Sequence, residues 1–156
     1  MTKIEWQDDL DTGIEVIDNQ HRRMVAMANA VCEAQRTGDQ ATIAEVLEEL
    51  LDYTLSHFTF EEALMEDAGY AFVDAHKRVH QVYADRIEAY RGRFRAGEDI
   101  AEELRMMLIG WLFQHIRNDD WAYVDSVKRN ILKLTGDTAE GGWLPTMLRR
   151  FFAGKG

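Results

Sequence analysis

The chain has 156 residues, a length that suits a single domain with a hydrophobic core of its own. Its 18 basic and 28 acidic residues give a net charge of −10, which argues against nucleic acid as a partner because phosphate-binding surfaces need clustered Lys and Arg. The single cysteine excludes an internal disulfide and any cysteine-rich metal site. A charged start without a signal-peptide core, and apolar stretches shorter than the roughly 20 residues of a membrane span, predict a cytoplasmic protein without a membrane partner.

The distribution of proline predicts long helices. The one proline is Pro145, and its absence from 1–144 permits uninterrupted helices, because proline costs about 3 kcal/mol inside a helix. An irregular N-terminal arm over 1–17 is expected to precede a first helix that begins near Asp18 or Asn19, both good N-cap residues. Apolar residues at helical spacing predict further helices over about 39–67, 71–95, 99–116 and 121–134.

Long amphipathic helices joined by short turns predict an all-α protein with an antiparallel up-down-up-down four-helix bundle. The bundle domain is expected over 1–135, and 136–156 is expected to form a linker and a short C-terminal helical extension. Three alternatives remain for this tail: docking on its own bundle, on a protein partner or on a membrane surface. Its amphipathic character comes from Trp143, Leu144, Met147, Leu148, Phe151 and Phe152 beside Arg149 and Arg150.

The five histidines fall at corresponding positions of the predicted bundle. His21 is near the start of the first helix, and His57 is in the last third of the second. His76 and His80 are near the start of the third helix, and His115 is near the end of the fourth. In an antiparallel bundle these positions all lie at the same end. The sequence therefore predicts one cluster of histidines at that end.

The local spacing indicates that the histidines share a site with carboxylates. Residues four apart lie on one face of a helix and can hold the same ion. Such pairs are formed by His57 with Glu61 and by His76 with His80, while Asp120 follows His115 by five residues, where the helix is expected to fray.

Seven donors are too many for one tetrahedral zinc, which takes four ligands, and they suit two metals bridged by the carboxylates. Imidazole suits iron, copper, nickel or zinc, whereas calcium and magnesium prefer oxygen ligands. Mixed imidazole and carboxylate ligation with an open position is typical of non-haem iron that reacts with oxygen.

The complete pattern resembles the hemerythrin family. The stretch from Trp6 through Gly13-Ile-Glu-Val-Ile-Asp-Asn-Gln-His21 is also similar to bacterial members, and the resemblance covers about residues 4–130. The signature consists of His21, His57-x-x-x-Glu61, His76-x-x-x-His80 and His115-x-x-x-x-Asp120.

The resemblance implies a non-haem di-iron centre that binds O2 reversibly. By position, one iron would be held by three histidines and the other by two, and the second iron would have the vacant position for O2. The three histidines would be His76, His80 and His115, and the two would be His21 and His57. The bridging groups would be Glu61, Asp120 and an oxo or hydroxo group. The O2 pocket would be lined by Trp111, Leu112 and Ile116.

The implied function is oxygen storage, transport or delivery, not enzymatic catalysis. Sensing of O2, redox state or NO through the same centre is the alternative, although a sensor usually requires a linked output domain. A ferritin-like di-iron oxidase is less favoured, because such sites use Glu-x-x-His pairs and no histidine here has a Glu three residues before it. A further possible partner is a protein that would bind the C-terminal tail.

Overall fold

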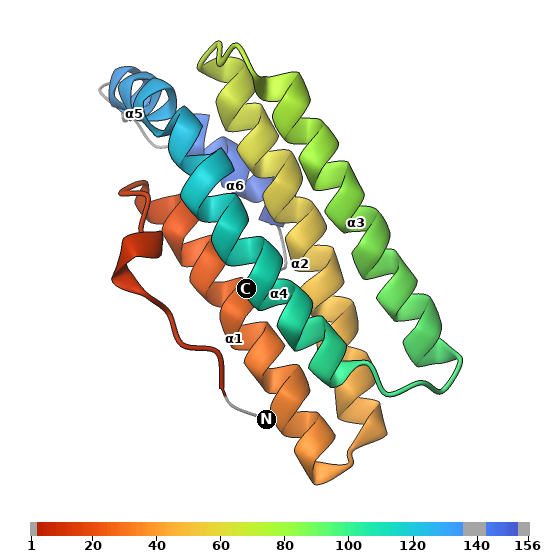
Figure 1. Cartoon of the computed structure of the whole chain (residues 1–156). Coiled ribbons are helices and arrows are strands. Elements are labelled where there is room, and N and C mark those ends of the chain that lie inside the picture. Colours follow the sequence, from red (N-terminus) through yellow and green to blue (C-terminus); the bar gives the residue numbers. More distant parts are fainter. Residues whose placement is uncertain (1–2, 136–142, 153–156) are drawn as a thin grey trace.

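A computed structural model describes residues 3–135 and 143–152, and every regular element in these ranges is helical. Four long helices run side by side in alternating directions (Figure 1), which confirms the predicted antiparallel bundle. Within the same ranges, no helix is both long and apolar enough to cross a membrane. The bundle helices are α1 (Glu15–Thr37), α2 (Gln40–Asp67), α3 (Val73–Arg95) and α4 (Ala101–His115).

The start of α1 differs from the prediction. The helix begins at Glu15, and Asp18 is buried inside its first turn with 4% of its surface exposed. The Asp18 carboxylate accepts hydrogen bonds from the backbone N–H of Thr12 at 2.8 Å, from the Thr12 hydroxyl at 2.7 Å and from the N–H of Gly13 at 3.0 Å. The predicted N-cap was wrong because this carboxylate binds the preceding arm instead of the helix end.

The turn between α1 and α2 follows from local chemistry. Gly38 ends α1 with a φ of 77°, a left-handed conformation that glycine adopts without a steric penalty. Asp39 then caps α2, since its side chain accepts a hydrogen bond from the Thr42 N–H at 3.1 Å. The two helices therefore reverse direction over two residues, and α2 begins within one residue of the predicted start near 39.

A π-helical turn, Ile116–Asp120, connects α4 to α5 (Trp121–Thr135) where fraying was expected. In an α-helix, residues five apart lie about 140° apart around the axis. A π turn closes its hydrogen bonds over five residues, so His115 and Asp120 come to nearly the same face. The local distortion therefore brings these two side chains to one site.

The core consists of two apolar clusters that flank the histidine level of the bundle. On α1, Ile17 belongs to the cluster at the α5 end, and Met24 belongs to the larger cluster in the body of the bundle. His21 lies between them in sequence, and all three side chains are fully buried. Apolar packing on both sides thus fixes the rotation of the helices that carry the polar side chains.

The helix of the tail, α6 (Trp143–Phe152), packs on the chain's own bundle against α2 and α5. The ring of Phe152 lies 5.2 Å from that of Tyr53 and 5.6 Å from that of Phe60, and Phe151 lies 6.4 Å from Phe60. Of the three alternatives for the tail, the structure shows docking on the bundle. The predicted linker over 136–142 lies outside the described residues.

Deleting residues 137–156 is expected to lower stability without removing the histidine cluster. The deletion exposes the rings of Tyr53 and Phe60 on α2, and loss of one buried aromatic contact costs about 1.5–3 kcal/mol. Urea unfolding of the full and the truncated chain measures the difference, and metal content measured on both chains checks the site. Loss of metal from the truncated chain would show that α6 supports the centre itself.

Candidate metal centre

The structure brings all seven predicted site residues together at the end of the bundle where α5 begins. They come from α1, α2, α3, α4 and the π turn, and each has at most 5% of its surface exposed. Such complete burial of ionisable groups is costly unless each finds a charged or hydrogen-bonding partner. The residues are His21, His57, Glu61, His76, His80, His115 and Asp120.

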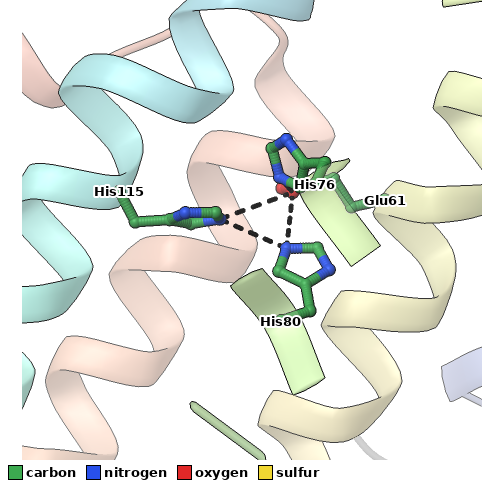
Figure 2. A group of neighbouring side chains, drawn as sticks. All are labelled: Glu61, His76, His80 and His115. Carbon is green, nitrogen blue, oxygen red and sulfur yellow. Dashed lines mark hydrogen bonds and ion pairs between the residues drawn. The ribbon is translucent and has the colours of Figure 1, made fainter. Parts of the chain in front are cut away.

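Figure 2 shows three of the imidazoles, those of His76, His80 and His115, with their Nε2 atoms directed toward the Glu61 carboxylate and toward one another. Nε2 of His76 lies 2.8 Å from Oε1 of Glu61, and Nε2 of His80 lies 3.1 Å from the same oxygen. The Nε2 atoms of His80 and His115 are 3.2 Å apart. The Nε2 atoms therefore converge on a small volume, as ligand atoms around a cation do.

The candidate ligand atoms form two groups on either side of a shared carboxylate. Within each group, one ligand atom per residue lies within 4.8 Å of all the others. The first group has three imidazoles and the second has two. The first is Glu61, His76, His80 and His115, and the second is His21, His57 and Glu61.

Glu61 presents one oxygen to each group. Its Oε1 faces His76 and His80, while its Oε2 lies 3.2 Å from Nε2 of His57 and 3.9 Å from Nε2 of His21. The position four residues after His57 on α2 places this carboxylate on the same helix face as that imidazole.

Asp120, in the π turn, also presents one oxygen to each histidine group. Its Oδ2 lies 3.3 Å from Nε2 of His21 in the two-histidine group. Its Oδ1 lies 3.1 Å from the Nε2 atoms of both His76 and His115 in the three-histidine group. Two carboxylates, each with one oxygen toward each group, form a geometry suited to bridging two cations.

Some oxygens of these two carboxylates have no hydrogen-bond partner among the described residues, which bears on whether a metal fits the site. Oε2 of Glu61 and both oxygens of Asp120 are buried without an aligned hydrogen-bond partner in the described part of the chain. Buried polar atoms normally have a partner, and cations bound between the imidazoles and carboxylates would supply one. The mixture of imidazole and carboxylate donors suits iron. The residues present therefore fit a two-metal centre.

The carboxylates are held in their anionic form. Burial alone would raise the pKa of Glu61, but the close contact with His57, and then those with His76 and His80, hold it well below the ordinary value. Burial and the charge of Glu61 would raise the pKa of Asp120, but His115 and His21 lower it instead. Both carboxylates are thus ready to bind cations at neutral pH.

In the metal-free chain, the pKa values of two histidines are shifted in opposite directions. Burial lowers the pKa of His57, although the charge of Glu61 opposes this, so His57 stays neutral as a metal ligand must. Burial also disfavours charge on His76, but close contacts with Asp120 and Glu61 outweigh it and raise its pKa to about 9. Metal binding at neutral pH must therefore displace a proton from His76.

Two residues outside the predicted set orient the ligands. Nδ1 of His57 lies 2.7 Å from Oε1 of Gln20, and Nδ1 of His80 lies 3.1 Å from Oε1 of Glu62. An imidazole that donates its Nδ1–H to such an acceptor presents the lone pair of Nε2 to a metal. Gln20 and Glu62 adjoin ligands in the sequence, but no pattern showed which way their side chains point.

A buried tyrosine is the third residue that sequence reasoning missed. Tyr123 is fully buried one turn after Asp120, and its ring lies 5.5 Å from that of His76. Burial, and then the charges of Glu61 and Asp120, raise the pKa of its phenol well above the ordinary value. Tyr123 follows Asp120 by three residues, and this helical spacing could have indicated from sequence that it lies near the site.

The three residues expected to line an O2 pocket are all buried. Trp111, Leu112 and Ile116 have at most 4% of their surfaces exposed, and the Trp111 ring stacks on His115 at 5.5 Å. Leu112 also lines a small apolar cavity between α1 and α4, together with Met24 and Ile4. These contacts place apolar walls beside the histidine cluster.

Replacing Gln20 by leucine is expected to weaken metal binding by about 10–100-fold, because His57 loses the acceptor that fixes its orientation. Competition with a chelator measures the change. Gln114→Leu is the matched control, since Gln114 also adjoins a ligand, His115, but is exposed. Equal affinities for the two variants would contradict an orienting role for Gln20.

Comparison with known proteins gives a consistent result. Residues 12–124 match the family described as Hemerythrin HHE cation binding domain. The bacteriohemerythrin of Pseudomonas paraeruginosa is 57% identical over 97% of this chain and 99% of its own length. That of Stenotrophomonas maltophilia is 54% identical over 97% and 99%. A crystal structure of wild-type hemerythrin has a TM-score of 0.72 and 28% identity, with 81% of this chain and 98% of that chain covered.

The extent of these matches separates the bundle from the tail. The family match ends at residue 124, so α6 lies beyond it, whereas the two bacterial relatives match almost the whole chain. The helical fold, the buried histidine and carboxylate cluster and the similarity over nearly the full length agree. The chain belongs to the hemerythrin family.

Proposed function

We propose that the chain holds two iron ions and binds O2 reversibly, for oxygen storage, transport or delivery. The observation that carries this proposal is that Glu61 and Asp120 each present one oxygen to a three-histidine group and one to a two-histidine group. Membership of the hemerythrin family supports iron as the metal and O2 as the ligand.

The proposed ligand sets follow the two groups. Glu61 and Asp120 would hold the two irons from both sides, and an oxo or hydroxo group would complete the bridge. When bound, the irons supply the two electrons by which O2 is held reversibly. His76, His80 and His115 bind one iron, and His21 and His57 bind the other.

The unequal number of imidazoles gives O2 one place to bind. The two-histidine group supplies one donor fewer than the three-histidine group, so an iron held there would have one position open. Trp111, Leu112 and Ile116 are almost completely buried, and Trp111 packs on His115, so these side chains would limit the access of water to the centre. Exclusion of water and protons slows irreversible oxidation, which a reversible carrier requires.

The donor set favours a carrier over a di-iron oxidase. Five imidazoles and two carboxylates make a less anionic site than the Glu-x-x-His pairs of ferritin-like proteins. Fewer anionic donors stabilise highly oxidised iron less well, so reversible binding is favoured over turnover.

Anaerobic iron loading followed by cycles of O2 and argon tests the proposal. We expect two irons per chain and a visible charge-transfer band that appears under O2 and disappears under argon. His57→Ala should weaken iron binding or O2 retention, because it removes one of only two imidazoles on that side. Irreversible oxygen consumption with release of an oxidised product would support the oxidase instead.

A further inference from the structure

A line of aromatic rings leads from the three-histidine group to the surface. The Trp111 ring stacks on that of His115, with centroids 5.5 Å apart and an interplanar angle of 22°. The Tyr83 ring, on α3, lies 4.3 Å from that of Trp111. Tyr83 is half-buried, and the exposed Arg86 guanidinium lies 5.7 Å from its ring centroid, so the line ends at solvent.

The two side chains beyond the imidazole are ones that can lose an electron. Indole and phenol are among the most easily oxidised groups in proteins, whereas a phenyl ring is not. Phe58 also packs here, stacked on His80 at 4.1 Å and in edge contact with Trp111 at 5.6 Å. Phe58 therefore holds the rings in place, and only Trp111 and Tyr83 can pass an electron by transient oxidation.

The surroundings of the two rings favour oxidation that ends on Tyr83. A phenol that loses an electron also releases its proton, and the half-buried Tyr83 can release it to water. The Nε1–H of Trp111 is buried without an acceptor in the described ranges, so an oxidised Trp111 keeps its proton and stays a strong oxidant. The electron vacancy then moves outward from Trp111 to Tyr83.

We propose that Trp111 and Tyr83 form an electron-transfer path that carries oxidising equivalents out of the di-iron centre when hydrogen peroxide reacts with it. This inference rests on the proposed function, because it needs iron at the histidine cluster. Its role would be protective. Oxidation that would otherwise fall on the buried ligands is moved to Tyr83 at the surface, where an external reductant can restore the phenol.

The electrons balance for a centre with one ferrous and one ferric ion. Reduction of one H2O2 to two H2O takes two electrons and two protons. The ferrous ion gives one electron and becomes ferric, and Tyr83 gives the other through Trp111. Tyr83 also loses one proton to solvent and becomes a neutral phenoxyl radical. A one-electron reductant such as ascorbate then supplies an electron, with a proton from water, and restores the phenol.

A second aromatic line is less suited to this chemistry. Tyr123 lies 5.5 Å from His76 and 6.3 Å from the half-buried Tyr70, which are longer steps than that from Trp111 to Tyr83. The hydroxyl of Tyr123 is buried without a hydrogen-bond partner among the described residues, so an oxidised Tyr123 has no acceptor in reach for its proton. Oxidation should therefore fall on Tyr83 before Tyr70.

The test treats the half-reduced iron protein with H2O2, freezes it within milliseconds and records the radical by electron paramagnetic resonance. Peptide mapping by mass spectrometry locates the oxidised residues. Tyr83→Phe keeps the ring but removes the phenol, and Trp111→Phe interrupts the path. Tyr90→Phe is the matched control: Tyr90 is also half-buried on α3, with the Arg93 guanidinium 5.7 Å from its ring centroid.

We expect a tyrosyl radical and oxidation at Tyr83 in the unmodified protein and in Tyr90→Phe. In Tyr83→Phe, the tyrosyl radical and the oxidation at position 83 should fall to the level of a zinc-loaded control. Oxidation in this variant should shift to Trp111 and the ligand histidines. Trp111→Phe should likewise lose oxidation at Tyr83. A tyrosyl radical that persists in Tyr83→Phe, or oxidation of the unmodified protein that maps to Tyr70 and Tyr123, overturns the path.

Iron content and the O2-dependent band, measured on the same samples, separate this inference from the proposed function. Tyr83→Phe should retain both, because Tyr83 is not one of the candidate ligands and the substitution keeps the ring that packs on Trp111. If the unmodified protein binds two irons and O2 but Tyr83 is not oxidised, only the path is wrong. If it binds neither, the proposed function itself is wrong.

Discussion

Replacing Glu61 by glutamine is expected to reduce iron binding from two ions per chain to at most one and to abolish the O2-dependent band. Glutamine has nearly the same shape, but it carries no charge and has only one acceptor oxygen. In the native chain, Oε1 of Glu61 faces His76 and His80, and Oε2 faces His57. An amide therefore presents an NH2 group to one of the two histidine groups, where a metal cannot bind it. Iron analysis and visible spectroscopy after anaerobic loading measure the result.

Glu66→Gln is the matched control for this substitution. It makes the same chemical change on the same helix, but Glu66 is exposed and forms an ion pair with Lys77. Surface ion pairs contribute about 0–1 kcal/mol, so this variant should load and cycle like the unmodified protein. Two irons and a reversible band in Glu61→Gln would show that Glu61 does not bridge the metals.

The iron-free protein is expected to lose about 3 kcal/mol of folding stability as the pH rises from about 6.5 to about 9, because of His76. Close contacts with Asp120 and Glu61 raise the pKa of this imidazole to about 9 in the folded chain, although burial opposes its charge. A raised folded-state pKa contributes stability that is complete below the unfolded-state pKa. That contribution disappears as the pH rises through the folded-state pKa. Urea unfolding of the iron-free protein across this range measures the loss.

Two controls assign this pH dependence to the imidazole. His76→Gln in its iron-free form should show a much flatter profile between pH 6.5 and 9, because no histidine at this position can release a proton. The folding stability of the iron-loaded protein should also change little over this pH range, because metal binding excludes the proton from His76. An unchanged slope in His76→Gln would place the titrating group elsewhere.

Most of the architecture could be predicted from sequence because helix formation is a local property. The spacing of apolar residues and the stop at Gly38 define the first two helices to within a few residues. The start of α1 could not be predicted in this way. Asp18 is a good N-cap residue in isolation, but its carboxylate binds the N–H groups of Thr12 and Gly13 once the arm folds back.

The candidate ligands could also be identified from sequence, because residues four apart on a helix share a face whatever surrounds it. His115 and Asp120 are the exception, since a spacing of five separates two side chains in an α-helix. Only the π turn resolves this, and its geometry is not apparent from the residues Ile116–Asp120 alone.

Local patterns along the chain therefore show which residue types are available and at which end of the bundle they gather. They do not show that Glu61 and Asp120 each direct one oxygen to either histidine group, that Gln20 contacts His57, or that Tyr83 packs on Trp111. These contacts join residues on different helices. They depend on how each helix is rotated about its own axis, and the packing of the whole core sets that rotation.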